Sequence, residues 1–190
     1  MVFTDMDGVV AKYERASFVE REDGSLPFMD PGIHYFSSRI PDQRIIDAYE
    51  RLSKNHDFQR IIDAYEHLSK NHYFFVLSNI VDDPTISNEH EEDKKEWVKK
   101  YMPFVDINSQ LYVIKEPKYK TAERLLGLKL EKTDILISDF NNDIYPWIEA
   151  GGTAIKYLNG INDPNSYRGP QITQEMEPEE IERYIEFFVA

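Results

Sequence analysis

Two aspartates separated by one residue stand near the start of the chain, directly after a short apolar segment. Val2 and Phe3 lead into Asp5-Met6-Asp7-Gly8. Carboxylates held this close repel each other, so a cation or a shared proton is expected between them. Oxygen ligands with no Cys or His nearby favour Mg²⁺, and Gly8 permits the tight turn that follows. The spacing therefore predicts a cation-dependent acid pair at a strand end.

Other residues that could do chemistry follow later apolar segments. Ser78 and Asn79 close one such run, and Asp139 and Asp143 come just after another. Two lysines, Lys118 and Lys120, precede an amphipathic stretch. Taken alone, Ser78 could be a strand-end cap, the aspartates could be turn or helix-cap residues, and the lysines could be solvated. Their order along the chain favours a shared site.

The elements that must position these residues are short apolar runs alternating with helix-like stretches. Runs bounded by polar turns are typical of buried parallel strands. The expected strands are 2–3, 73–77, 111–114, 135–137 and 153–158, and the expected helices are about 42–55, 59–71, 89–101, 118–127, 141–149 and 178–188. This alternation predicts an α/β fold with a Rossmann-like, doubly wound parallel sheet. If the strands that carry the polar groups are neighbours, those groups meet in one crevice beyond the carboxyl edge.

Residues 11–41 interrupt the alternation. They contain Glu22-Asp23-Gly24, several prolines and five aromatic residues: Tyr13, Phe18, Phe28, Tyr35 and Phe36. We expect a small cap insert after the first strand of a single domain spanning 1–190. The aromatic residues are expected mainly to pack the insert onto the main body, and the alternative is that one or two face a planar ligand.

A tandem duplication follows the insert. Residues 43–58 and 59–74 are copies of one 16-residue sequence and differ only at Arg51/His67 and Asp57/Tyr73. A shift of 16 residues rotates a helix face by roughly 160°, so one continuous helix cannot bury both copies on the same side. We predict two helices, with the second copy against the sheet and the first displaced toward the insert or a partner chain, which would make a homodimer.

Composition excludes several classes of protein. There are 22 Lys and Arg against 35 Asp and Glu, a net charge of −13, which argues against binding duplex nucleic acid or anionic membranes. The absence of cysteine excludes a disulfide scaffold, a thiolate zinc site and a cysteine nucleophile. No apolar run is long enough to span a membrane, and the first residues lack the pattern of a signal peptide. A cytoplasmic protein is the expectation.

The set of motifs resembles the haloacid dehalogenase (HAD) superfamily of phosphohydrolases. The resemblance implies that Asp5 is the nucleophile and Asp7 the general acid/base, with Ser78 as the second motif. It implies a phosphate-binding lysine as the third, for which Lys120 is preferred and Lys118 is the rival. The fourth motif matches Asp139-Phe140-Asn141-Asn142-Asp143. The metal ligands that the resemblance implies for Mg²⁺ are Asp5, Asp7, Asp139 and Asp143, and the phosphate-binding residues are Ser78, Asn79, Lys120 and Lys118.

Within the superfamily the chain looks most like the 5'(3')-deoxyribonucleotidases. The supporting segments are Asp5 to Ala11, 31–36, 95–98, Trp147 and 150–156. The resemblance implies a Mg²⁺-dependent phosphatase that acts on a small phosphorylated substrate, a (deoxy)nucleoside monophosphate, through an aspartyl-phosphate. The alternatives are another phosphomonoester such as a sugar phosphate, or a non-catalytic protein that binds a phosphate ligand.

Three further features are expected to be structural. The run from Glu89 to Lys100 is acidic and then basic, as in a solvated helix aligned with its dipole. Asn159-Gly160 indicates a turn. Trp97 and Trp147 are expected in the core.

Overall fold

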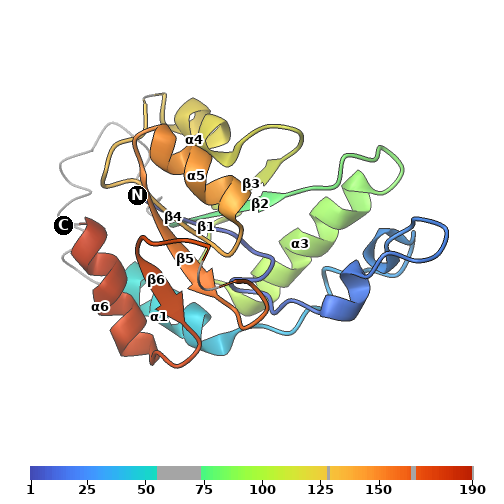
Figure 1. The fold of residues 1–190 in the computed structure, drawn as a ribbon, viewed down its shortest axis with the longest axis horizontal. Helices are drawn as coiled ribbons and strands as arrows, with labels where there is room; N and C mark the ends of the chain where they lie inside the picture. Colours follow the sequence, from blue (N-terminus) through green and yellow to red (C-terminus); the bar gives the residue numbers. More distant parts are fainter. Residues whose placement is uncertain (55–73, 128, 164–165, 190) are drawn as a thin grey trace.

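A six-stranded parallel sheet forms the centre of the molecule in the computed structural model (Figure 1). The structure describes residues 1–54, 74–127, 129–163 and 166–189. The strands are β1 (Val2–Thr4), β2 (Phe74–Asn79), β3 (Gln110–Val113), β4 (Ile135–Ser138), β5 (Thr153–Leu158) and β6 (Gln171–Thr173), in the spatial order β3-β2-β1-β4-β5-β6. This confirms the predicted α/β fold with a doubly wound parallel sheet.

The order of the strands places the three polar groups side by side. β1 lies between β2 and β4, with Phe3 paired to Phe75 and to Leu136. The chain therefore winds one way from β1 through β2 to β3 and the other way from β4 to β6. In sheets of this kind ligands bind beyond the carboxyl ends of the strands, at the point where the winding reverses. Asp5 and Asp139 directly follow β1 and β4 there, and Ser78 lies near the end of β2. The strand β6 was not predicted, because three residues with one buried side chain carry no period to detect.

Helices cover both faces of the sheet (Figure 1). They are α1 (Gln43–Lys54), α3 (Ser87–Tyr101), α4 (Lys118–Leu126), α5 (Asn141–Glu149) and α6 (Pro178–Val189), with short 3₁₀ turns at Arg15–Phe18, Pro27–Met29 and Ile107–Ser109. One core cluster joins α1, α3 and α6 to one face, and the other joins α4 and α5 to the opposite face. Trp97 lies in the first cluster and Trp147 in the second, which confirms both as core residues. Among the described helices, none is both long and apolar enough to cross a bilayer.

The first copy of the duplicated sequence packs directly into the core as α1. Ile45, Ile46, Tyr49 and Leu52 are buried against the sheet and α6. The Tyr49 hydroxyl lies 3.0 Å from Thr4 Oγ1, one residue before the acid pair begins. The prediction that the first copy is displaced from the sheet is therefore wrong. The second copy lies outside the described residues except for Phe74, so the prediction of a second helix there is not tested.

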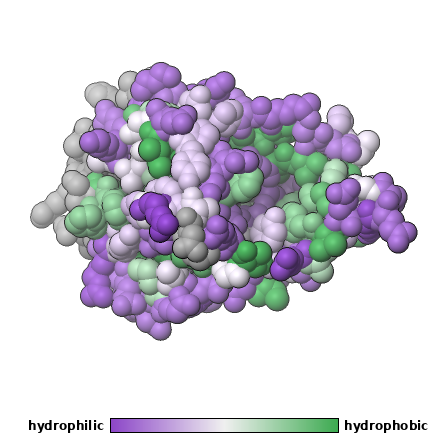
Figure 2. Space-filling view, in the orientation of Figure 1, coloured by the Kyte–Doolittle hydropathy of each residue, from purple (hydrophilic) through white to green (hydrophobic). Residues whose placement is uncertain are grey.

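The insert leaves and rejoins the main body at one point. Ala11 and Pro41 form an antiparallel bridge, and Asp42 N donates to Val10 O. Between them, Phe28, Tyr35 and Phe36 form a small buried cluster with neighbours that include Phe18 and Val81. The insert thus packs its aromatic residues largely on one another and on the main body. The face shown in Figure 2 is mostly hydrophilic, as the charge of the sequence implies.

Candidate active site

Asp5 lies at the end of β1, and hydrogen bonds fix both its backbone and its carboxyl group. Its backbone N–H donates to Ile137 O of β4 at 2.8 Å, and its Oδ1 accepts the Met6 N–H at 2.8 Å. The turn then reverses at Gly8, whose φ is +78°. A β-carbon at Gly8 would overlap the Asp139 carboxylate, so glycine is needed there for space as well as for backbone conformation. The acid pair is therefore packed tightly against the fourth motif.

Lys118 is the lysine that enters the site. Its Nζ lies 2.6 Å from Asp5 Oδ2 and 2.9 Å from Asp143 Oδ2, and the side chain is buried. Burial alone would lower the pKa of Lys118, but the charges of Asp5 and Asp143 outweigh it and raise the pKa. Lys120 is exposed. Two residues along a helix point about 200° apart, so only one of the pair can face the strand ends. The sequence-based preference for Lys120 as the lysine that faces the site is therefore wrong.

Asp143 contacts Lys118, the same lysine that binds Asp5 of the acid pair. Ser138 Oγ lies 3.4 Å from both Asp5 Oδ2 and Asp143 Oδ2, and it accepts the Phe140 N–H at 3.2 Å. Ser138, the last residue of β4, therefore ties this strand to the start of α5. Asp143 holds Lys118 in place, which gives it a role in positioning the lysine in addition to the metal binding that the sequence suggested.

Asp139 is held by a residue that the sequence indicated only as a turn. The Asn159 side chain donates from Nδ2 to Asp139 Oδ2 at 2.8 Å and to Gly8 O at 3.2 Å. Its Oδ1 accepts the backbone N–H groups of Ile161 and Asn162 at 3.0 and 3.1 Å. All four hydrogen-bonding positions of this amide are thus used. Asn159 braces the Asp139 carboxylate against the turn that follows Asp7.

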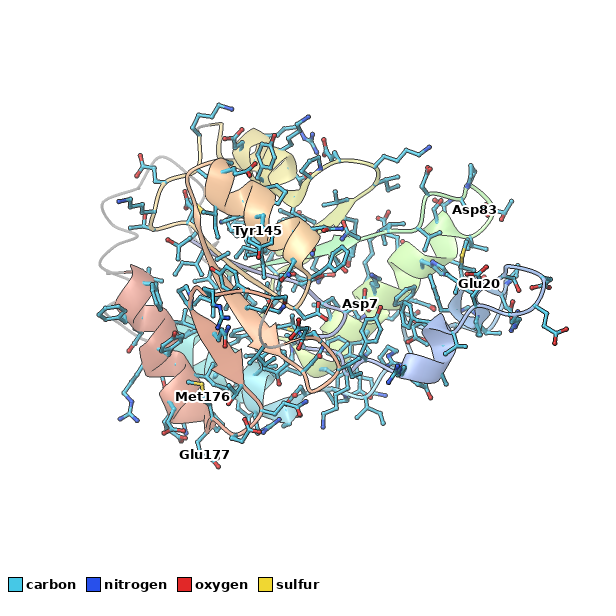
Figure 3. The ribbon with its side chains drawn as sticks, in the orientation of Figure 1. Asp7, Glu20, Asp83, Tyr145, Met176 and Glu177 are labelled. Atoms are coloured by element: carbon cyan, nitrogen blue, oxygen red, sulfur yellow. The ribbon has the colours of Figure 1, made fainter. Side chains whose placement is uncertain are left out.

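Lys94 is a second buried lysine in the site, and sequence reasoning missed it. Its Nζ lies 2.5 Å from Asp7 Oδ2, 2.9 Å from Ser78 Oγ and 2.7 Å from Asn79 O. Figure 3 shows Asp7 near the middle of the molecule, beside α3. The expectation of a solvated helix from Glu89 to Lys100 is wrong for this face. Lys94 lies three residues before Trp97, which is the spacing of one helix face.

The electrostatics of the site show a deficit of positive charge. Burial, followed by the charges of Asp143 and Asp7, raises the pKa of Asp5 to about 6, although Lys118 opposes the shift. Burial and the charge of Asp5 raise the pKa of Asp139 to about 7. Carboxyl groups with raised pKa values in one crevice are typical of functional sites.

The donor set fits a hard divalent cation. The groups that converge are carboxylate and carbonyl oxygens, which Mg²⁺ prefers. Four carboxylates (Asp5, Asp7, Asp139 and Asp143) face only two buried ammonium groups. Among the described residues, no three His, Asp or Glu side chains are grouped closely enough to hold a metal ion. Asp5 Oδ2 and Asp7 Oδ2 instead contact Lys118 and Lys94. The excess of carboxylates over ammonium groups favours a bound cation.

An aromatic residue of the insert also borders the crevice. Tyr13 stacks on Phe18 with ring centroids 4.3 Å apart. Burial, and then the charges of Asp139 and Asp7, raise the pKa of the Tyr13 hydroxyl. The side chain is half-buried, and its hydroxyl lies within the electrostatic field of the acidic groups.

Solved structures resemble this fold. A HAD hydrolase of family IA, variant 3, from Entamoeba histolytica aligns over 97% of this chain and 98% of its own, with a TM-score of 0.50 and 17% identity. A HAD-superfamily hydrolase from Ehrlichia chaffeensis has a TM-score of 0.46 and 16% identity. That alignment covers 80% of this chain and 61% of the other chain, less than two thirds of its length. At these identities the likeness shows a HAD-like fold alone.

No protein-family model matches the sequence, and no curated protein matches it. The similarity to 5'(3')-deoxyribonucleotidases that the sequence suggested gains no support from these comparisons.

Proposed function

We propose that this chain is a Mg²⁺-dependent phosphomonoesterase that works through an aspartyl-phosphate at Asp5. The observation that carries the proposal is the arrangement around Asp5. A buried lysine binds one of its oxygens, the charge of Asp7 two residues on acts on its carboxyl group, and a second acidic motif follows the adjacent strand. The HAD-like fold supports the same reaction class.

The roles follow from the chemistry of each group. Asp5 attacks phosphorus in line, so a bond forms between its carboxyl oxygen and phosphorus as the bond to the leaving oxygen breaks. Lys118, Ser78 and the residue after it, Asn79, hold the phosphoryl oxygens while charge develops. Asp7 gives a proton to the leaving oxygen, and it later takes one from the water that hydrolyses the aspartyl-phosphate.

The metal-binding residues in this proposal are Asp5, Asp139 and the backbone carbonyl of Asp7, with Asp143 adjacent. Bound Mg²⁺ supplies the positive charge that offsets repulsion between a phosphate dianion and Asp5. Lys118 remains between Asp5 and Asp143, and its charge offsets the remaining repulsion between the phosphate and Asp5.

The proposed substrates are (deoxy)nucleoside monophosphates. Support comes from the half-buried ring of Tyr13, stacked on Phe18 and placed within the field of Asp139 and Asp7. A planar base favours an aromatic face, since stacking tolerates any base. A sugar phosphate offers no planar aromatic ring to stack on this surface.

Hydrolysis assays test the proposal. Purified protein should release phosphate from p-nitrophenyl phosphate with Mg²⁺ and not with EDTA, and a panel of nucleoside 5'- and 3'-monophosphates and sugar phosphates should rank nucleotides first. Asp5→Ala, purified in parallel, should be inactive and folded, which excludes a contaminating phosphatase. Near-normal Mg²⁺-dependent turnover in Asp5→Ala would refute the mechanism. A better rate with sugar phosphates would refute the substrate class alone.

A further inference from the structure

Lys94 connects three residues of the candidate site that come from the ends of two different strands. Asp7 lies in the turn after β1, whereas Ser78 and Asn79 end β2. One ammonium group reaches all three, at 2.5 Å from Asp7 Oδ2, 2.9 Å from Ser78 Oγ and 2.7 Å from Asn79 O. An ammonium carries three hydrogens and no acceptor. Its hydrogens are all directed at protein groups, so Lys94 has none left for a substrate.

The two side-chain partners are oriented by this contact. Lys94 binds Oδ2 of Asp7, which leaves Oδ1 as the oxygen that can carry a proton. Ser78 Oγ must accept from Lys94, since an ammonium can only donate. The hydrogen of the Ser78 hydroxyl is therefore free to donate elsewhere, as a phosphoryl oxygen would require. Lys94 thus orients both groups as the proposed reaction needs.

The helix that carries Lys94 is itself firmly held. Trp97, one turn further along α3, is buried and donates from Nε1 to Arg39 O at 2.8 Å. Asp93, the residue before Lys94, lies 2.8 Å from His34 Nδ1 in the insert. The Lys94 ammonium also lies 4.2 Å from the ring centroid of Phe36, within cation–π range. A side chain fixed from so many directions can hold Asp7 within a fraction of an ångström, as positioning requires.

We propose that Lys94 is a positioning residue that holds Asp7 for proton transfer to the leaving oxygen. The inference rests on the proposed phosphatase function. In the step concerned, the bond between phosphorus and the leaving oxygen breaks, Asp5 forms the new bond to phosphorus, and the Asp7 proton passes to the departing oxygen. Loss of Lys94 should therefore hurt substrates whose leaving group must be protonated.

The test compares two esters with and without the lysine. Glycerol 2-phosphate releases an alkoxide that needs a proton, whereas p-nitrophenyl phosphate releases a stable phenolate that does not. The quantity measured is kcat/KM, which reports steps up to phosphoryl transfer and excludes hydrolysis of the aspartyl-phosphate. Disturbance of Ser78 should lower kcat/KM for both esters by the same factor, so the ratio of the two values reports on Asp7 alone.

The expected result is a selective loss. Lys94→Met should lower kcat/KM for glycerol 2-phosphate by roughly 10–100-fold more than for p-nitrophenyl phosphate, the range typical of residues that orient a functional group. Asp7→Asn should shift the ratio in the same direction, and the double variant should shift it no further, because both remove one function. Lys95→Met is the matched control, since the contacts of Lys95 among the described residues are with Glu91, Glu92 and the ring of Tyr112 and not with the acid pair. Its ratio should match the wild type.

The absence of cysteine in this chain allows a chemical rescue. Lys94→Cys introduces a single thiol, and alkylation with 2-bromoethylamine in denaturant followed by refolding restores an ammonium at that position alone. The rescued protein should recover the wild-type ratio, whereas the unmodified Cys variant should not. This arm also decides the matter if Lys94→Met fails to fold.

Two outcomes would overturn the inference about Lys94, and a third would overturn the proposed phosphatase function as well. Equal losses for both esters in a folded Lys94→Met protein would mean that Lys94 is only structural. Failure of aminoethylation to restore the ratio in refolded protein would mean the same. If the wild-type protein hydrolyses neither ester with Mg²⁺, the proposed function fails and the inference fails with it.

Discussion

Asp139→Asn should stabilise the metal-free protein while abolishing its proposed activity. In the folded chain, burial and the charge of Asp5 raise the pKa of Asp139 from 3.8 to about 7. The folded state therefore disfavours the ionised form that the unfolded chain adopts at neutral pH. A group that function requires can cost stability in this way.

The magnitude follows from the size of the shift. Moving a pKa from 3.8 to about 7 corresponds to roughly 4 kcal/mol of unfolding free energy at a pH above both values. An amide at this position can still accept the hydrogen bond from Asn159 Nδ2, although less strongly than a carboxylate does. We therefore expect Asp139→Asn to gain roughly 2–4 kcal/mol at pH 8.

The sign of the pH dependence makes the prediction specific. Between pH 3.8 and about 7 the native state binds more protons than the unfolded state at this residue, so wild-type stability falls as pH rises through that window. Asp139→Asn lacks this contribution. The difference in unfolding free energy between variant and wild type should be close to zero below the unfolded-state pKa. It should grow as pH rises toward about 7 and level off above that value.

Urea unfolding in EDTA at pH 4, 6 and 8 measures the effect. Addition of Mg²⁺ should then stabilise the wild-type protein and not the variant, since a ligand that binds only the native state adds to its stability. A variant that is no more stable than wild type at pH 8, or a gain that is the same at every pH, would refute the reasoning.

Three further changes test other parts of the structure. Lys118→Met should lower kcat/KM by roughly 10²–10³-fold, as loss of a group that stabilises developing charge does, whereas Lys120→Met should leave it nearly unchanged; the reverse order would restore the sequence-based preference. Asn159→Asp should raise the Mg²⁺ concentration for half-maximal activity by roughly 10–100-fold, because it replaces a hydrogen-bond donor to Asp139 with a like charge. An unchanged Mg²⁺ requirement would contradict the role of Asn159 in holding Asp139. Deletion of residues 43–58 should give a folded, active protein, checked by thermal unfolding and turnover, since the second copy supplies the same apolar residues at the same spacing; an unfolded product would show that the full duplication is needed.

The sequence predicted the strands that carry the site because their buried runs are bounded by polar turns. Asp5, Ser78 and Asp139 each follow such a run, and parallel pairing of β1 with β2 and β4 brings them together. This part depends only on strand order, which the alternation of elements restricts strongly.

Residues whose placement depends on helix phase were harder to predict. Lys118 and Lys120 differ by two positions, and the first residue of α4 decides which one faces the strand ends. Lys94 lies among charged residues that give α3 a solvated composition, and only its spacing from Trp97 marks the buried face. The placement of the duplicated helix could not be read from the sequence, because both copies carry the same apolar stripe.

The packing of the first copy as α1 has a consequence for mutational robustness. The buried residues of α1 recur sixteen positions later as Ile61, Ile62, Ala64, Tyr65 and Leu68. Exchange of the copies would keep every one of these buried side-chain types and would replace Arg51 with His67, with loss of the ion pair between Arg51 and Glu179.

A surface ion pair of this kind contributes about 0.2–1 kcal/mol, so the two alternative threadings are set apart by a small energy. The extra chain has the same length in either threading, and loop-closure entropy changes little with where such a segment is placed. We therefore expect a polar substitution such as Leu52→Asp, which would disrupt a single-copy helix, to be tolerated better in this chain, because the intact copy can take the position of the first. Each copy would then be under weaker purifying selection than a core helix that occurs once.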